Sequence, residues 1–426
     1  MREMTQAVES RPEVQERSWG LMIGLSAGHL VKHFYQQAFL LLIPAVKAAM
    51  GLSDVQVGVI GMSRTIFSAA VNIPAGIVGD MWREKVALIL AGSLSSLALG
   101  YFLIGVYPNY WLLLLGVAVT GIGTSLWHAP AFGTLAALYP QRKAFAMSLH
   151  RMGGSLGDSI SPVVMGVLLG GFAFWGLQWG GMGWRALALV LVAPALISAG
   201  VILLAHKSLK SAGGQATDLR AYIRSVGPLF TNSTVMGMVV LASVRAMAHN
   251  GLNIFLILYM SEDLHFSAFK TGYHVALLTF FGVLFAPVMG WASDRFGRRP
   301  VIFLGLLAMT VLIFALLPFG QGWAFTLILA LLGLFLYTVN PVMLAAAMDA
   351  AKPGTESSIT ALQFTGPAIL GAISPVIAGW LRENYGMDGV FYYSGAIVAA
   401  ITVVALFMPM RRFSAEPVER SVHNGH

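Results

Sequence analysis

The stretch GWASDRFGRR, residues 290–299, is the most informative part of this chain of 426 residues. It is a strongly charged turn between two apolar segments, 267–291 and 300–318. Each segment falls within the range of about 17 to 25 residues that a helix needs to cross a lipid bilayer. The stretch therefore predicts two consecutive membrane-crossing helices joined by a short basic turn.

The same turn occurs twice in the chain. GIVGDMWREK, residues 76–85, lies 214 positions before the first residue of the later turn, and ISPVVMG, residues 160–166, lies 213 positions before ISPVIAG, residues 373–379. Both offsets are about half of 426 residues. We therefore predict an internal duplication, and duplicated transport folds place the substrate between their repeats near the middle of the bilayer.

Composition assigns the chain to the membrane proteins. It is 57% hydrophobic and only 10% charged, whereas soluble proteins carry about 25% charged residues. Apolar segments separated by polar residues predict twelve membrane-crossing helices, at 18–45, 55–79, 85–106, 110–138, 144–170, 184–206, 228–260, 267–291, 300–318, 322–348, 356–381 and 388–410.

The positions of Lys and Arg predict the orientation. Eighteen of the 26 lie in the tails and loops on the side of the two termini, four lie on the opposite side, and four lie within the spans. Cytoplasmic loops carry the excess of basic residues, so the net charge of +8 does not indicate nucleic acid. The polar N-terminus lacks the features of a signal peptide. We expect a multi-pass protein of the inner (cytoplasmic) membrane with both termini in the cytoplasm.

The predicted fold is an all-α membrane protein with two pseudo-symmetric six-helix bundles. The longest polar connection contains Gly, Ser and basic residues, as expected for a cytoplasmic linker. The expected division is an N-terminal tail, a first bundle, a linker, a second bundle and a C-terminal tail, at 1–17, 18–206, 207–227, 228–410 and 411–426.

The charged turns resemble the signature of the major facilitator superfamily, G-x-x-x-D-R-x-G-R-R. The later turn matches fully, and the earlier copy has Met81 in place of the first arginine. The resemblance implies the fold of that family and a gating role for the turn, where acids and bases pair across helix ends. A merely solvated basic turn is the alternative. The residues with the implied gating role are Gly76, Asp80, Arg83, Gly290, Asp294, Arg295, Gly297, Arg298 and Arg299.

Within that family the chain resembles exporters of the fosmidomycin-resistance type. The resemblance lies in GHL at 28–30, LWHAPAFG at 126–133 and RMGGSLGDSISP at 151–162. The exporter pattern has an acidic residue just after the His-Pro of the fourth helix, where this chain has Ala131. This difference concerns the substrate and the coupling ion and leaves the predicted fold unchanged.

Two of the predicted helices carry polar stripes. In GHLVKHFYQQ, residues 28–37, the spacing places His29, Lys32, His33 and Gln36 on one helical face. An ionisable group inside a membrane span is costly and usually faces a cavity. The equivalent helix of the second half carries Arg245, His249, Asn250 and Asn253, of which the first, second and last share a face.

The spans hold more base than acid. Arg64, His128 and Arg151 add to the two stripes, and Asp158 is the single carboxylate predicted deep within a span. Unpaired buried charge is strongly unfavourable, so these side chains predict a cavity of positive potential that attracts an anion. Lysine and arginine both bind carboxylate and phosphate groups.

Each residue also has an alternative role. Four alternatives remain open. Lys32 extends to the membrane interface, Arg64 bonds helix-end carbonyls, Arg151 belongs to a cytoplasmic gate, or Arg151 and Asp158 form a permanent ion pair. The expected substrate-binding residues are His29, Lys32, His33, Gln36, Arg64, His128, Arg151, Arg245, His249, Asn250 and Asn253, and the candidates for proton coupling are Asp158, His29 and His33.

These features predict a secondary active transporter that moves a small organic anion across the inner membrane by alternating access, with protons as the coupling ion. A proton-driven drug or antibiotic efflux pump of the fosmidomycin-resistance type is the alternative, and a transport-inactive membrane sensor is a third. The chain has no P-loop, no HExxH motif and no cysteine. We therefore expect no enzyme activity, no cofactor, no metal site, no nucleic-acid partner and a monomer in the bilayer.

Overall fold

The computed structural model describes residues 19–205, 209, 224, 227–351 and 356–408. The predicted tails, 1–17 and 411–426, and almost all of the predicted linker, 207–227, lie outside this described part. The boundaries predicted for the two bundles therefore stay predictions.

The described chain is almost entirely helical, and its helices are long. They are α1 (Trp19–Met50), α2 (Asp54–Met81), α3 (Val86–Val106), α4 (Tyr110–Leu138), α5 (Lys143–Gly170), α6 (Trp184–Val190), α7 (Val192–Leu204), α10 (Ser233–Leu258), α11 (Ala268–Phe296), α12 (Arg298–Phe319), α13 (Gly322–Asp349) and α14 (Glu356–Phe407). Short 3-10 helices lie at Arg83–Lys85, Pro140–Arg142 and Gly227–Thr231, and a π-helical turn, Tyr259–Asp263, follows α10.

These helices make the twelve predicted spans. Ten helical segments of the described residues are long and apolar enough to cross a membrane, with α6 and α7 counted as one. The eleventh span is α1, whose polar stripe lowers its hydropathy. The twelfth arises because α14 is two helices joined at Gly386, whose φ of 67° interrupts the helical backbone. Glycine adopts positive φ at little cost. The prediction of an all-α membrane fold is confirmed, although the first helix runs five residues further than the predicted end at 45.

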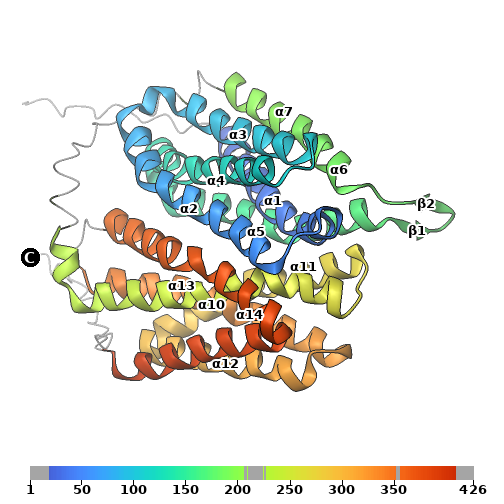
Figure 1. Cartoon of the computed structure of the whole chain (residues 1–426). Coiled ribbons are helices and arrows are strands. Elements are labelled where there is room, and N and C mark those ends of the chain that lie inside the picture. Colours follow the sequence, from blue (N-terminus) through green and yellow to red (C-terminus); the bar gives the residue numbers. More distant parts are fainter. Residues whose placement is uncertain (1–18, 206–208, 210–223, 225–226, 352–355, 409–426) are drawn as a thin grey trace, which may run out of the picture.

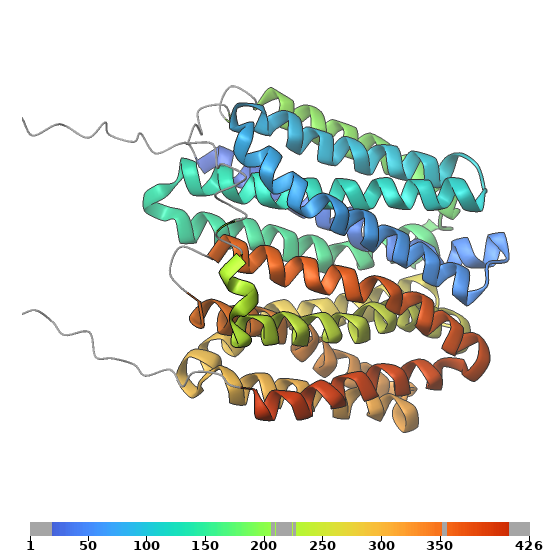
Figure 2. The same cartoon turned by 60° about the vertical axis from the view of Figure 1, so that its left-hand side comes forward.

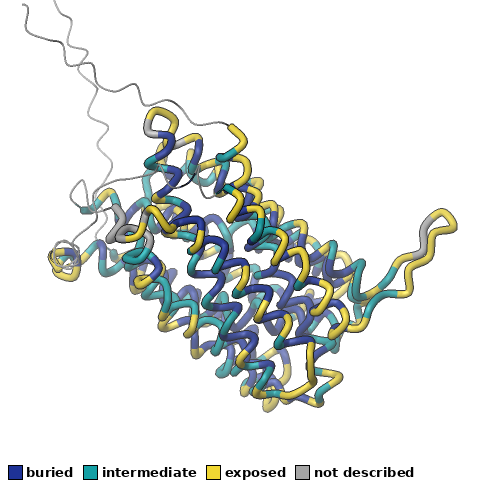
Figure 3. The backbone as a smooth tube through the Cα atoms, turned by 90° about the horizontal axis from the view of Figure 1, so that it is seen from above, coloured by how far each residue is buried: buried dark blue, intermediate teal, exposed yellow. Residues whose placement is uncertain are grey.

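The helices lie in two layers, with α1 to α7 in one half and α10 to α14 in the other (Figures 1 and 2). We call the end of the bundle with the hairpin of β1 (Phe172–Phe174) and β2 (Leu177–Trp179) the hairpin face. We call the opposite end, where α1 begins and α14 ends, the linker face. Buried residues lie on the sides of the helices that face other helices, and the hairpin projects beyond the helices (Figure 3).

The two halves touch through α2 against α14 and α5 against α11. A Cβ added at Gly58 would lie 2.3 Å from the carbonyl oxygen of Pro375, and one added at Gly272 would lie 2.1 Å from that of Pro162. These approaches are too close for any side chain, so glycine is required at both crossings. Both contacts lie in the parts of the helices toward the hairpin face.

A cluster of ion pairs closes the hairpin face. Arg382 of α14 contacts Asp54, Glu262 and Asp263 at 2.8, 2.8 and 2.6 Å, and Lys47 of α1 contacts Asp54 and Glu262 at 2.6 and 2.8 Å. Lys47 and Asp54 belong to the first half, and the other three belong to the second. The cluster therefore joins the two halves at this face.

The charged turn of the second half lies at the linker face. Arg298 is paired with Asp294 and, at 2.8 Å, with Asp349, so it ties together the ends of α11, α12 and α13. Gly297 has a φ of 94° and separates two helices. These ion pairs lie within one half. The side chains of Asp80 and Arg83 in the earlier copy fall outside the described part.

We predict that the Arg382 cluster holds the hairpin face closed. Arg382→Gln removes the ion pair that joins Asp54 to α14 and leaves Lys47 as the cation that contacts Asp54 and Glu262, so the two halves should separate there more often. The readout is the labelling rate of Ile254→Cys by a thiol reagent, since Ile254 packs against Gly61 of the other half and the chain has no native cysteine. Breaking a buried ion pair typically costs several kcal/mol, so the rate should rise at least about tenfold.

The matched control is Arg185→Gln. Arg185 donates hydrogen bonds to the carbonyl oxygens of Gly105 and Val106, all within the first half. An equal labelling rate in both variants and the parent would contradict a closing role for Arg382.

Candidate functional site

Lys32 is the most buried cation of the site, with 1% of its surface exposed. Its ammonium lies 2.8 Å from His128 Nε2 of α4, 3.0 Å from Gln36 Oε1 and 3.4 Å from His33 Nε2. All three partners are neutral acceptors when the imidazoles are uncharged. In the described part of the chain, no carboxylate lies within ion-pair distance of Lys32.

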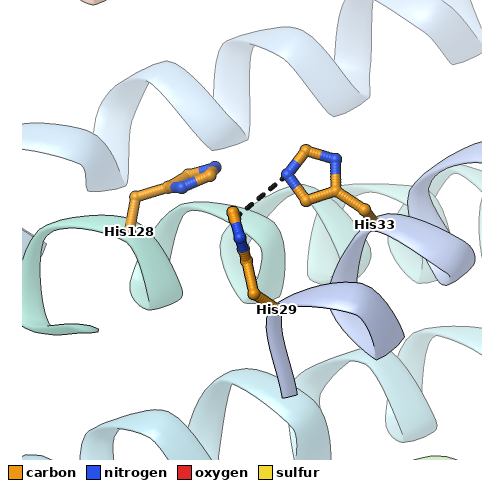
Figure 4. Close-up of side chains that lie close together, drawn as sticks. All are labelled: His29, His33 and His128. Atoms are coloured by element: carbon orange, nitrogen blue, oxygen red, sulfur yellow. Dashed lines mark hydrogen bonds between the residues drawn. The ribbon is translucent and has the colours of Figure 1, made fainter. Parts of the chain in front are cut away.

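Two imidazoles on the same face of α1 form a relay beside Lys32. His29 Nδ1 lies 2.7 Å from the carbonyl oxygen of His150, and His33 Nδ1 lies 3.0 Å from Asp158 Oδ1 on α5. Carbonyl and carboxylate oxygens accept, so both Nδ1 atoms donate. The two Nε2 atoms then face each other at 3.1 Å (Figure 4). The chain of contacts runs from Asp158 through His33 to His29.

Asp158 is the acidic centre of the site. Besides His33, it interacts electrostatically with Lys32 of α1, Arg64 of α2 and Tyr337 of α13. Thr279 of α11 also approaches its backbone carbonyl at 3.4 Å. Asp158 therefore lies where the first half meets the second, as the position of a site between two repeats requires.

Close glycine contacts bring Asp158 to α1. Added Cβ atoms at Gly153 and Gly157 would each lie 2.3 Å from a carbonyl oxygen of α1, those of Ser26 and Leu30. These glycines let α5 pack directly on α1. The stretch GGSLG thus positions the carboxylate against the polar stripe.

The second half contributes a buried guanidinium with spare hydrogen-bond capacity. Arg245 of α10 is 7% exposed and donates from Nη1 to the carbonyl oxygen of Leu336 at 3.1 Å. Its Nε is buried without a hydrogen-bond partner, and so is Nδ1 of His249. Among the described residues, Arg245 has no carboxylate within ion-pair distance. Tyr337 interacts electrostatically with both Arg245 and Asp158, which connects the two halves of the site.

Other predicted residues differ in their surroundings. Asn250 donates to the carbonyl oxygen of Gly371 at 3.1 Å, so its amide joins α10 to α14. Asn253 is half-buried on the same helix. Arg64 is half-buried, with its guanidinium 5.8 Å from the centre of the Phe39 ring.

Arg151 lies apart from this cluster. Its side chain is exposed, two turns of α5 from Asp158 toward the linker face. The alternative of a permanent Arg151–Asp158 ion pair does not hold in this structure, since Asp158 pairs with His33. The reason is the close packing of α5 on α1, which brings the imidazole nearer than the guanidinium.

The structure adds polar residues that the sequence analysis did not select. Buried atoms without a hydrogen-bond partner include Asn340 Oδ1 of α13 and, from α14, both amide atoms of Gln363 and the hydroxyl of Thr365. Each is an uncharged polar residue within a predicted span, which was the available signal. Buried polar groups normally have partners, so these groups favour a site that a polar ligand completes.

Comparisons with known proteins agree with the fold and with the charged turns. A family model described as Major Facilitator Superfamily matches residues 25–283 and 238–424. The fosmidomycin resistance protein of Escherichia coli (strain K12) is 20% identical over 404 residues, covering 93% of this chain and 94% of that protein. A putative metabolite transport protein of Haemophilus influenzae is 25% identical over 406 residues, covering 92% and 95%.

Solved transporters share the architecture. A bacterial homologue of the human lysosomal transporter Spinster, in an inward-facing and occupied conformation, superposes with a TM-score of 0.75 at 16% identity, covering 93% of this chain and 98% of that chain. The nucleoside transporter NupG superposes with a TM-score of 0.70 at 12% identity, covering 91% and 98%. At these identities the likeness concerns the fold alone.

The predicted family resemblance is confirmed by the family model, which covers most of the chain, and by relatives that align over nearly its whole length. The chain belongs to the Major Facilitator Superfamily and is a multi-pass membrane transporter rather than an enzyme.

Proposed function

We propose that this transporter moves a small organic anion, of the carboxylate, phosphonate or phosphate type, by alternating access coupled to protons. The observation that carries the proposal is the pair of buried cations, Lys32 and Arg245, one in each half. Neither has a carboxylate partner within the described residues. A buried charge without a counter-charge is strongly unfavourable, and an anionic solute supplies that counter-charge.

The donors around the two cations suit an oxyanion. Lysine offers a compact charge, and the guanidinium of arginine offers a planar set of donors. Arg245 Nε is buried without a hydrogen-bond partner and is available to donate to the anion. An anion held between Lys32 and Arg245 would draw the two halves together at the centre, which links binding to their relative motion.

The closed hairpin face supports alternating access. Ion pairs and close glycine contacts join the halves there, whereas the ion pairs of Arg298 at the linker face stay within one half. We propose that the site exchanges solute with the linker face in this state. Opening the hairpin face then requires the Arg382 cluster to break.

The geometry around Asp158 supports proton coupling. One proton between the facing Nε2 atoms of His29 and His33 would convert two opposed lone pairs into a hydrogen bond and place a positive charge beside Asp158. Histidine changes protonation near neutral pH more readily than other side chains. We propose that Asp158, His33 and His29 carry the coupled proton as one unit.

We also propose that the linker face is cytoplasmic and that the protein resides in the inner membrane as a monomer. The support for the orientation is the excess of Lys and Arg in the tails and connections on that side.

Proton-driven export of a drug or antibiotic is the second candidate. Its support is the name of the Escherichia coli relative, the fosmidomycin resistance protein, which aligns along nearly the whole chain. The cationic site favours an anionic substrate under either candidate.

We predict that Lys32→Ala and Arg245→Ala each weaken binding of the anion at least about tenfold, because truncating one partner of a buried charge pair typically costs several kcal/mol. The assay is thermal stabilisation of purified protein by succinate, methylphosphonate and inorganic phosphate, since a ligand stabilises the folded state by mass action. Flux of the anion that stabilises most is then measured in proteoliposomes.

Lys270→Ala is the matched control, since Lys270 is an exposed cation whose side chain lies over the Phe266 ring. Unchanged affinity and flux in both Lys32→Ala and Arg245→Ala would rule out the cationic site.

We predict that Asp158→Asn abolishes accumulation driven by a pH gradient while preserving exchange of labelled for unlabelled solute. The amide oxygen still accepts from His33 Nδ1, so the geometry is kept, but the negative charge that stabilises a proton on the imidazoles is lost. The measurement compares the two flux modes in proteoliposomes. Asp388→Asn, at an exposed acid near the Gly386 kink, is the control. Undiminished accumulation in Asp158→Asn would exclude this acid from coupling.

We predict that Gln178→Cys, in β2, reacts with a membrane-impermeant maleimide in intact cells, and that Gln141→Cys reacts only after the membrane is opened. Both glutamines are exposed, one at the hairpin face and one at the linker face. Absence of native cysteine makes each signal specific. The reverse pattern would show that the termini lie outside.

A further inference from the structure

Three imidazoles from two helices converge at the centre of the first half. His29 and His33 come from α1 and His128 comes from α4, and one nitrogen of each lies within 4.8 Å of the others (Figure 4). His29 is buried, and the other two are half-buried. The cluster is therefore compact, and two of its rings are partly exposed.

Two of the rings are held in the orientation that a metal ligand needs. Nδ1 of His29 donates to the carbonyl oxygen of His150, and Nδ1 of His33 donates to Asp158. Histidines that bind metals almost always donate their other ring N–H to a carbonyl or a carboxylate, which fixes the ring and its tautomer. The Nε2 atom of each neutral ring is thereby left as the acceptor that is available to a metal.

The spacing also fits a small metal ion. Metal–nitrogen bonds of about 2.0–2.1 Å in a tetrahedral site place two ligand nitrogens roughly 3.3 Å apart. The Nε2 atoms of His29 and His33 are 3.1 Å apart. His128 completes the set after a shift of its ring by at most about 1.5 Å, since the ligand atoms lie within 4.8 Å of one another and must close to roughly 3.3 Å.

The ammonium of Lys32 competes for this position. It lies 2.8 Å from His128 Nε2 and therefore occupies that lone pair. Gln36 Oε1, at 3.0 Å, is a second acceptor that keeps the ammonium bonded when it leaves His128. Lys32 thus weakens metal binding, both by occupying a ligand atom and by its charge.

We propose that His29, His33 and His128 form a binding site for a divalent transition-metal ion of the zinc, cobalt or nickel class, with solvent at the fourth position. Imidazole ligands suit these metals. The sequence predicts no metal site, since it has neither cysteine nor an HExxH motif; the three ligands meet only through the packing of α1 on α4. The inference does not depend on which solute is transported.

The test is a titration of the purified full-length protein, without a polyhistidine tag, with Co²⁺ followed by visible absorption and with Zn²⁺ in competition with a chelating dye. We expect a saturable site with a tetrahedral Co²⁺ spectrum. His33→Gln and His128→Gln should each weaken binding by about 10- to 100-fold or more, since losing a ligand costs at least as much as losing an outer partner. His265→Asn, at an exposed histidine with a φ of 50°, should bind like the parent.

Lys32→Gln is the decisive variant. It should tighten Co²⁺ binding by roughly tenfold or more, because it removes a positive charge next to the metal. A residue with a merely structural role would not do so. The inference is overturned if Co²⁺ binding survives in both histidine variants, if His265→Asn abolishes it, or if Lys32→Gln leaves it unchanged. His128→Gln alters a half-exposed ring and serves as the readout should His33→Gln fail to fold.

Discussion

The cost of holding the Lys32 ammonium in the middle of a membrane helix governs much of this structure. The side chain is 1% exposed, and a cation at that depth is expensive unless the protein surrounds it with acceptors. The first half supplies them from α1 and α4, as Gln36 and His128. These acceptors solvate the ammonium without neutralising it, so the positive charge remains available to a ligand.

Asp158, the single acid predicted deep within a span, also leaves the positive charge of the site without a direct ion pair. Asp158 orients His33 instead of forming an ion pair with Lys32 or Arg64, although it interacts with both electrostatically. The site therefore keeps an excess of positive charge. Because Asp158 also lies at the contact of α5 with α11, a change in the charge of the imidazoles would act where the two halves meet.

The two ends of the bundle differ in how the halves are joined. At the hairpin face, two ion pairs, Lys47–Glu262 and Arg382–Asp54, cross the interface, and glycines at 58 and 272 bring backbones into contact. At the linker face, the ion pairs of Arg298 stay within one half. Charge pairs that cross the interface can open and close, whereas those within a half make it a rigid body, and a transporter that alternates between two states needs both kinds.

The sequence by itself determined the number of spans, the duplication and the family, because hydrophobic length and the charged turns are local patterns that survive without knowledge of packing. It also identified both polar stripes, since helical spacing alone places His29, Lys32 and His33 on one face. Only the tertiary structure decided their partners. Close packing of α5 on α1 pairs Asp158 with His33 and leaves Arg151 exposed, and the packing of α4 on α1 brings His128 to Lys32. Contacts between helices depend on glycine crossings and on the relative rotation of each helix, which no single segment encodes.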